Sequence, residues 1–587
     1  MGEGKRRNWK SLVFFSVLLI FIIAGCSTSQ ETHQLGREKE QEFDQGSGMK
    51  FSSLSEQKIV DLAKLSKVWG VVKYHHPKVV SGDVNWDYEL FRVVPSILEE
   101  NSDVNSILYE WVHSLGSESI SGELDDKYQF SKDSIQLSPS TDWSKDEEYL
   151  GTDLSLELSK LLDSNISERE YAYVSFKEDS FFPSMENENP YSNMNFDDTG
   201  YRLLGLFRYW NIIEYYYPYK DVIGEDWDRV LQEFIPKMVD GSDYDSYFMT
   251  LAELTTRIHD SHAYLVGKDR ETITDYFGTY RLPVNFIEIN NQIVINKVIN
   301  KCGLEVGDIV LKVGDKNIDE LLEDRRKYIS QSREDTASLF FLDLFRTEQQ
   351  NTNVTVIRQG NKMNISAVGS QQDINFLVDT KSQAMESGEI YYINAGLLKD
   401  GEIDKIMKKW WNTKGLIVDL RNYPSSILTY ELAKYLIASE KEFSTASVPN
   451  RAIPGEFYYL EPMVSGKPQE TNAEVYKGKV VILINEHTTS QGEFTTMSLR
   501  NTENSIVLGR PSAGTDGDIR IIMLPGKIKT AISGLGIFNP DKNPTQRIGL
   551  QPDIRLDPTI EGIMEGRDEY IERAVELIKG MSTLSYR

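Results

Sequence analysis

Apolar and aromatic positions recur at helical spacing between residues 51 and 116, and the pattern returns between residues 199 and 268. The segment WGVVKYHHP, Trp69–Pro77, is echoed by WNIIEYYYP, Trp210–Pro218. A Trp-Asp pair and an aliphatic-Pro pair further along keep the same offset in sequence. Because chance rarely preserves one register across several landmarks, the pattern predicts a duplicated helical unit.

The Trp and Tyr residues of the two helical segments predict core packing, since large aromatic side chains dominate buried surfaces. The alternative is a cell-wall-binding protein that holds glycans on Trp69, Tyr74, Trp210 and Tyr216. It requires those rings to be exposed. Between the helical segments, residues 117–198 are acidic, serine-rich and weakly periodic, which predicts an irregular connector.

Short alternating apolar runs, typical of β-strands, occupy residues 272–370. Among them, GLEVGDIVLKVGDKNI (Gly303–Ile318) resembles the PDZ domains of bacterial proteases. Its glycines supply turn geometry, and Asp308 can accept hydrogen bonds from the turn backbone. The resemblance implies a β subdomain that binds extended or C-terminal peptide segments by strand addition. A plain β subdomain without a ligand is the alternative.

Apolar, β-branched runs alternate with helical stretches from residue 385 to residue 580. These runs read EIYYINAG, GLIVDLRN, KVVILIN and SIVLG. They predict an α/β core around a largely buried sheet. A chain of 587 residues is expected to form several domains. The predicted class is therefore multidomain α+β, with a helical repeat region, a PDZ-like subdomain and an α/β core.

The formal net charge of −26 argues against a nucleic-acid partner, because phosphate binding requires clustered Lys and Arg. The chain shows no H-E-x-x-H motif, P-loop or dinucleotide fingerprint. Its two cysteines, Cys26 and Cys302, are too few for a Cys-ligated zinc site. We expect no metal and no organic cofactor.

The N-terminus has the pattern of an export signal, with a basic start and an apolar run over Leu12–Ile23. The Ile-Ala-Gly-Cys sequence that ends at Cys26 resembles the lipobox of bacterial lipoproteins. This implies that residues 1–26 are a lipoprotein signal peptide, cleaved before Cys26, which carries the lipid. Polar residues 27–50 predict a flexible tether. An uncleaved anchor is the alternative; both place the body in the bacterial cell envelope, membrane-anchored and outside the cytoplasm.

Ser490 stands where a predicted buried strand passes into a helix, in the stretch TTSQGEF. Together with Glu493 it forms a good capping box, which explains the spacing completely. The same position also suits a nucleophile, because the helix N-terminus stabilises negative charge and the Gln491 amide can point at an oxyanion. Local sequence leaves both readings open.

Four segments of the α/β core occur in an order that resembles the tail-specific protease core of the S41 serine peptidase family. They are DLRNYP (419–424), NEHTTSQGE (485–493), GRPSAGTDG (509–517) and GLQPDI (549–554). Upstream, IHDSHAYL (258–265) resembles the D-x-H motif of that family. The likeness spans about residues 200–580 and implies a serine peptidase with protein or peptide substrates.

Within this resemblance, Ser490 is the expected nucleophile and His262 the general base that takes its proton. The turn 513–517 lacks the lysine that serves as base in other members, so the tricorn-like Ser-His arrangement is preferred. In that arrangement Ser261 orients the imidazole. A packing role for His262, with His259 as the nearest rival base, is the alternative.

Two departures from the family pattern affect the expected site. Gln546 stands near the place where the tricorn-like arrangement carries a glutamate, and would support His262 without charge. Pro424 falls in the loop that donates an oxyanion amide in relatives and has no N–H, so the second donor would be the Tyr423 or Asn422 amide beside Gln491. These departures leave a second hypothesis, a catalytically inactive peptide-binding lipoprotein on an S41 protease scaffold.

Overall fold

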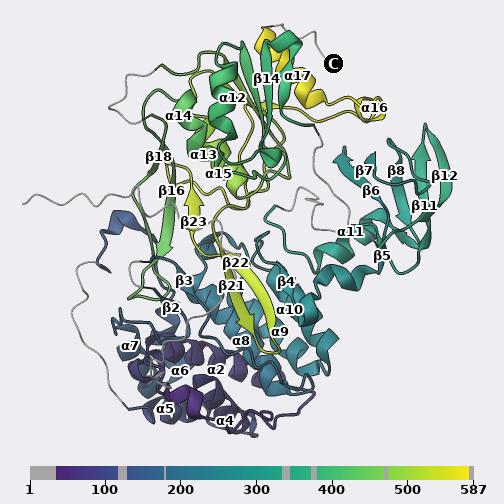
Figure 1. Ribbon diagram of the computed structural model, residues 1–587. Coiled ribbons are helices and arrows are strands. Elements are labelled where there is room, and N and C mark those ends of the chain that lie inside the picture. Colours follow the sequence, from purple (N-terminus) through teal and green to yellow (C-terminus); the bar gives the residue numbers. More distant parts are fainter. Residues whose placement is uncertain are drawn as a thin grey trace, which may run out of the picture.

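The computed structural model describes residues 35–116, 128–177, 180–333, 344–371, 380–467 and 474–580. The predicted signal peptide, residues 1–26, lies outside these ranges. Figure 1 shows a helical part at the foot of the molecule, a β subdomain at its right and an α/β core at the top. None of the helices within the described ranges combines the length and apolarity needed to cross a membrane.

Two long helices, α2 (Glu56–His75) and α8 (Thr199–Tyr216), form the centre of the helical part and are almost entirely buried along their C-terminal halves. They contact each other, and α9 packs against both. The remaining helices of this part are α1 (Gly36–Lys39), α3 (Pro77–Val80), α4 (Trp86–Leu98), α5 (Val104–His113), α9 (Trp227–Asp240) and α10 (Tyr244–Thr256).

The two predicted repeats share one unusual contact between tryptophans. Trp69 donates its indole N–H to the Trp86 carbonyl at 3.0 Å, and Trp86 donates to the Trp69 carbonyl at 2.9 Å. Trp210 and Trp227 make the same reciprocal pair at 2.8 and 3.1 Å. The same reciprocal contact therefore occurs in both segments of the predicted repeat.

The glycan-binding alternative is wrong, because the rings that it requires on the surface lie in the core. Trp69 is 0% exposed, Tyr74 1%, Trp210 2% and Tyr216 1%. Side chains with so little accessible surface offer no platform for a sugar, and they stabilise the fold by apolar burial instead.

A fully buried network of four charges joins the two repeats. The Lys73 ammonium lies 3.3 Å from Asp87 and 2.9 Å from Glu188, and the Arg208 guanidinium lies 2.8 and 2.9 Å from the same two carboxylates. All four side chains are 0% exposed. Arg208 also donates to the Met523 carbonyl at 2.7 Å, which ties the network to a hairpin of the core.

The region predicted to be an irregular connector contains regular structure in its described residues. Helices α6 (Glu147–Leu150) and α7 (Thr152–Leu162) pack together, and α7 also contacts α2 and α5. Strand β1 (Ile135–Leu137) pairs with a strand of the core. The buried apolar residues of α7, Leu154, Leu158 and Leu161, stand among polar residues. The helical pattern is therefore weak in this part of the sequence.

The β subdomain, predicted to be PDZ-like, contains a sheet with the order β12-β11-β8-β7-β6 and β9 paired to β8. Asp308 accepts from the Glu305 N–H at 2.8 Å, as expected for the turn. Helix α11 (Ile318–Arg326) packs on β8. The strands are β6 (Val284–Ile289), β7 (Gln292–Val298), β8 (Ile309–Val313), β9 (Lys316–Asn317), β11 (Asn351–Arg358) and β12 (Asn361–Val368).

The α/β core contains the sheet β13-β14-β15-β19-β20-β24, in which every pair from β14 onward is parallel. Its strands are β13 (Gln383–Met385), β14 (Ile390–Asn394), β15 (Gly415–Asp419), β19 (Lys479–Ile484), β20 (Ser505–Gly509) and β24 (Ile554–Arg555). Its helices are α12 (Glu402–Trp410), α13 (Leu428–Glu431), α14 (Ala433–Leu436), α15 (Gln491–Leu499), α16 (Ile560–Met564) and α17 (Glu569–Lys579).

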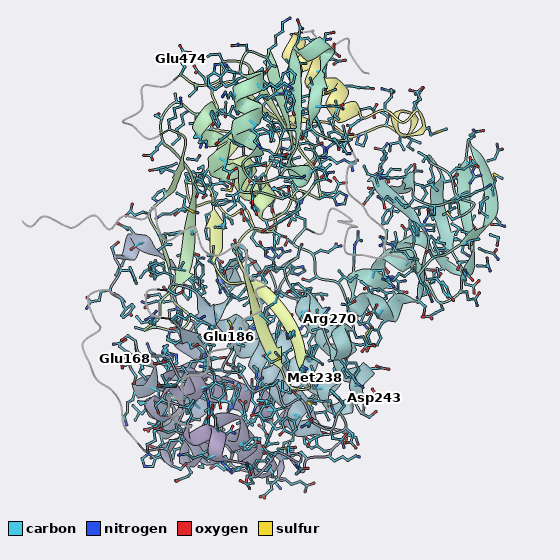
Figure 2. The ribbon with its side chains drawn as sticks, viewed as in Figure 1. Glu168, Glu186, Met238, Asp243, Arg270 and Glu474 are labelled. Carbon is cyan, nitrogen blue, oxygen red and sulfur yellow. The ribbon has the colours of Figure 1, made fainter. Side chains whose placement is uncertain are left out.

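A hairpin of the core reaches down to the helical part and connects the two. Strands β21 (Ile519–Leu524) and β22 (Ile528–Ser533) form it, and β22 pairs with β4 (Leu265–Val266), which follows His262. In Figure 2 the hairpin lies between Glu474, on the core, and Met238, on the helical part. A second core sheet has the order β1-β17-β16-β18, with strands β16 (Lys441–Pro449), β17 (Phe457–Tyr459), β18 (Met463–Ser465) and β23 (Gly536–Phe538), which pairs with β16.

Candidate active site

Ser490 lies on a strained turn between the buried strand β19 and helix α15. Its backbone angles are φ 50° and ψ −116°, a combination that a residue with a side chain rarely adopts. A neighbouring turn fixes it, because the Ser490 N–H donates to the Thr515 carbonyl at 2.7 Å. A strand-to-helix turn of this kind presents the serine hydroxyl at the carboxyl edge of the sheet.

Glu493 joins the Ser490 turn to the neighbouring turn at residues 512–515. Its carboxylate accepts from the Gly514 and Thr515 N–H groups at 2.8 and 2.9 Å, from the Ser490 N–H at 3.3 Å and from the Ser512 hydroxyl. Ser490 and Glu493 are arranged as a capping box, yet the Ser490 hydroxyl makes no capping hydrogen bond of ordinary geometry. The glutamate thus supports the turn that carries Ser490.

Two buried carboxyl groups lie beside Ser490. Burial raises the pKa of Glu493 to about 7, although its hydrogen-bond donors lower it. Burial also raises the pKa of Asp516 well above its ordinary value, and the nearby Glu493 charge raises it further. Asp516 accepts from the Gly517 N–H at 2.8 Å, while its Oδ2 is buried without a hydrogen-bond partner.

Replacing Asp516 by asparagine is expected to stabilise the protein more strongly at pH 8 than at pH 5. A carboxyl whose pKa is raised by folding stabilises the native state below its unfolded pKa and loses that contribution as pH rises toward the folded pKa. Asparagine stays neutral throughout this range. Urea unfolding at both pH values measures the effect.

The exposed Asp400→Asn is the matched control for that comparison and is expected to change the free energy of unfolding by less than about 0.5 kcal/mol. An Asp516→Asn variant whose stability falls with pH as steeply as the parent would contradict the expected role of this carboxyl.

His262 is buried between the D-S-H loop and the C-terminal end of β22, which lies at the open end of the core hairpin. Its Nδ1 is 2.9 Å from the Ser533 hydroxyl and 3.7 Å from the Asp260 carboxylate. Asp260 accepts from the N–H groups of His262 and Ser533, both at 2.9 Å, and so holds the loop against β22. Burial lowers the pKa of His262, while the charges of Asp260 and Asp518 raise it.

The other two residues predicted around His262, Ser261 and Gln546, bond to Ser332 instead of the imidazole. The Ser261 Oγ is 3.2 Å from the Ser332 Oγ and accepts from the Ser332 N–H at 2.9 Å. Gln546 donates its Nε2 to the Ser332 hydroxyl and to the His259 carbonyl, both at 3.3 Å. In this structure Ser533, instead of Ser261, faces the imidazole.

The turn at residues 512–518 connects the two halves of the site. The Thr515 carbonyl accepts from the Ser490 N–H, and the Thr515 hydroxyl pairs with Ser332 of the Ser261 cluster. The charge of Asp518, three residues after Thr515, raises the pKa of His262. The turn thus links the segment that carries Ser490 to the segment that carries His262, and within the described residues no hydrogen bond joins the two side chains.

The two predicted oxyanion donors meet at Ser490 in an unexpected way. The Ser490 side chain and the Gln491 N–H both act on the Tyr423 phenol oxygen, and each lowers the pKa of that phenol. Burial raises the pKa of this phenol, as does the Asp516 charge, while the two contacts lower it. Asn422 turns inward and donates its side-chain amide to Asn394 at 3.2 Å.

Sequence reasoning missed the carboxylates and the hydroxyl that surround the predicted pair. Asp260 stood in the quoted D-S-H motif, so its type and position could have suggested a role. Asp516 also stood in a quoted segment, GRPSAGTDG, whereas Ser533 and Asp518 come from the hairpin and the residue before it, where no local pattern indicates chemistry. Across the described ranges, no cluster of three or more His, Cys, Asp or Glu side chains has an arrangement suited to a metal ion.

A family comparison agrees with this geometry: residues 387–556 match the model of peptidase family S41. The chain carries a peptidase family S41 domain. The match covers β14 to β24 and includes both Ser490 and the turn at 512–518. The S41 domain places the protein among the serine peptidases, which are hydrolases. No match was found among curated protein sequences.

Solved protease structures are similar to this chain to different degrees. Mature CPAF complexed with lactacystin is 13% identical with a TM-score of 0.50, over 65% of this chain and 99% of the other. The photosystem II D1 C-terminal processing protease is 16% identical with a TM-score of 0.37, over 63% and 98%. The tricorn protease is 16% identical with a TM-score of 0.34, over 66% of this chain and 37% of the other.

Proposed function

We propose that this protein is an exported, lipid-anchored serine endopeptidase that cleaves peptide bonds through an acyl-enzyme on Ser490. The observation that carries the proposal is the strained backbone of Ser490 at the strand-to-helix turn of the S41 domain. An ordinary helix cap has extended backbone angles, whereas a nucleophilic serine between a strand and a helix sits on a sharp, strained turn. Strain of this kind concentrates at functional sites.

In the proposed reaction His262 is the general base. Its lowered pKa keeps the imidazole neutral near pH 7, so that it can take the Ser490 proton and return it to the leaving amine. Ser533 and Asp260 orient the ring. Because no hydrogen bond joins His262 to Ser490 here, substrate binding would have to tighten this contact, as catalytic contacts often do.

The substrates would be proteins or peptides. The β subdomain has β6 and β12 at the ends of its main sheet path, and such edges suit the capture of an extended segment by strand addition. A preference for C-terminal segments, the lipid on Cys26 and a position on the outer side of a bacterial membrane are parts of the proposal that rest on the sequence pattern.

The test is labelling of the full-length chain with a fluorophosphonate probe, followed by peptide mapping. We expect one label on Ser490, and Ser490→Ala should lower labelling to background. Ser505→Ala is the matched control, because Ser505 lies at the start of β20, at the opposite edge of the same sheet. Its labelling should equal that of the parent.

A second candidate function is a peptide-binding protein without catalysis. Two observations favour it: the missing Ser490–His262 hydrogen bond and the Tyr423 phenol against Ser490. An unlabelled parent with an intact circular dichroism spectrum, together with binding of unfolded casein, would support this candidate and count against the peptidase.

A further inference from the structure

A buried segment, Ser330–Arg333, follows helix α11 of the β subdomain along the chain and contacts two loops of the candidate site. The Ser330 hydroxyl accepts from the Asp260 N–H at 3.2 Å. At the other end of the segment, the Arg333 guanidinium donates to the Ser512 carbonyl at 2.7 Å. One end of the segment is thus bonded to the D-S-H loop, and the other is bonded to the turn that follows β20.

Ser332, between these two residues, makes hydrogen bonds to both loops at once. Its hydroxyl accepts from the Ser261 N–H at 2.9 Å, and its own N–H donates to the Ser261 Oγ at 2.9 Å. The same hydroxyl accepts from the Gln546 side-chain amide at 3.3 Å and pairs with the Thr515 hydroxyl. Ser332 is 1% exposed, so bulk water does not compete for these contacts.

The other partners of Ser332 fix the direction of its bond to Thr515. The Ser261 N–H and the Gln546 amide N–H can only donate, and a serine hydroxyl has one proton and two lone pairs. The Ser332 proton is therefore directed to the Thr515 hydroxyl. Thr515 in turn accepts the Ser490 N–H on its carbonyl at 2.7 Å. A continuous set of hydrogen bonds thus connects the residue before the proposed base to the proposed nucleophile.

We propose that Ser332 is a positioning residue for the peptidase reaction, whose hydroxyl holds the D-S-H loop, and with it His262, at a fixed distance from the turn that carries Ser490. This inference rests on the proposed peptidase function. His262 and Ser490 come from segments far apart in the sequence, so contacts between those segments set their separation. Ser332 reaches both segments from a third one.

The hydroxyl matters because proton transfer depends steeply on geometry. A misplacement of about 1 Å, caused by a change away from the reacting atoms, can cost about 100-fold in rate. Without its hydroxyl, residue 332 keeps the N–H that donates to Ser261 but loses the bond to Thr515. The D-S-H loop and the Ser490 turn then lose the contact through this oxygen, while each keeps its other bonds.

A purely structural role for Ser332 predicts a different result. It would lower the thermal midpoint and leave the kinetics of the folded protein unchanged. A positioning role lowers kcat and leaves KM nearly unchanged, because the chemical step suffers and substrate binding does not. It also affects His262 directly. Burial lowers the pKa of this imidazole against the charges of Asp260 and Asp518, so a loosened and better hydrated loop moves the acidic limb of kcat/KM to higher pH.

The experiment compares the full-length parent with Ser332→Ala, Thr515→Val, the double variant and Ser490→Ala. Thr515→Val removes the hydroxyl that pairs with Ser332 and keeps the backbone groups that bond Ser490 and Glu493. It carries the test if Ser332→Ala fails to fold. Quenched fluorescent casein gives kcat and KM between pH 5 and 8, and circular dichroism with the thermal midpoint monitors the fold.

Ser498→Ala is the matched control, because it also removes a fully buried serine hydroxyl from the core. The Ser498 hydroxyl lies 2.9 Å from the Thr429 carbonyl and 2.8 Å from the Ser465 hydroxyl, near the end of α15 that is remote from Ser490. We expect this variant to lower the thermal midpoint about as much as Ser332→Ala does. Its kcat should stay within about threefold of the parent.

We expect Ser332→Ala and Thr515→Val each to lower kcat by about 10- to 100-fold, with KM within about threefold of the parent and the acidic limb at higher pH. The double variant should be no more than about twofold slower than the slower single variant, since both remove one bond. Folded single variants with the kcat and acidic limb of the parent, or an equal loss of kcat in Ser498→Ala, overturn this inference alone. A parent with no Ser490-dependent cleavage overturns the proposed function, and the inference with it.

Discussion

Replacing His262 by alanine is expected to lower kcat/KM for peptide cleavage by about 10⁴- to 10⁶-fold, with the fold retained. Without the imidazole, the Ser490 hydroxyl keeps its proton at neutral pH and the leaving amine has no proton donor. Residual cleavage would come from the oxyanion donors and from substrate binding alone. Quenched casein hydrolysis and the rate of fluorophosphonate inactivation both measure the loss.

His259→Ala is the matched control for this prediction. His259 lies in the same loop, three residues earlier, and its Nε2 is 3.3 Å from the Glu225 carboxylate instead of facing the core hairpin. We expect this variant to retain activity within about threefold of the parent, as for an ordinary surface substitution. Equal losses in the two variants would contradict the assignment and indicate a general defect of the loop.

The pH profile of the parent protein tests the assignment of His262 as the general base. Burial lowers the pKa of His262 from 6.5, so the base stays neutral and active at pH values where an ordinary histidine is protonated. We therefore expect the acidic limb of kcat/KM to lie below pH 6.5.

The second large effect concerns stability. Arg208→Met is expected to lower the free energy of unfolding by about 3–5 kcal/mol, because it leaves the buried carboxylates of Asp87 and Glu188 with Lys73 as their one remaining cation. The variant also loses the bond to the Met523 carbonyl that attaches the core hairpin. Urea unfolding followed by tryptophan fluorescence measures it.

An exposed ion pair provides the control. Lys50 lies 2.6 Å from Asp197 with its side chain 77% exposed, so Lys50→Ala is expected to cost less than about 1 kcal/mol. A similarly small loss for Arg208→Met would mean that the buried network contributes no more than a surface pair. That result would contradict the role assigned to it in joining the two repeats.

The spacing of apolar residues predicted an element wherever that element buries a continuous face. The parallel strands β14, β15, β19 and β20 are apolar on both sides and follow the quoted runs closely. The tryptophan pairs were visible as a repeated spacing in the sequence, and both pairs make the same reciprocal contact. The helix α7 was missed, since few buried residues distinguish it from the polar sequence around it.

The sequence by itself determined the α/β core, the helical segments, the position of Ser490 at a strand-to-helix turn and the family resemblance that the S41 match bears out. These depend on local pattern and on the order of motifs. Only the tertiary structure decided what surrounds the nucleophile. It brought Ser533 to His262 across 271 positions and the Thr515 carbonyl to the Ser490 N–H. Such contacts depend on how separate loops meet at a sheet edge, and no local pattern encodes that meeting.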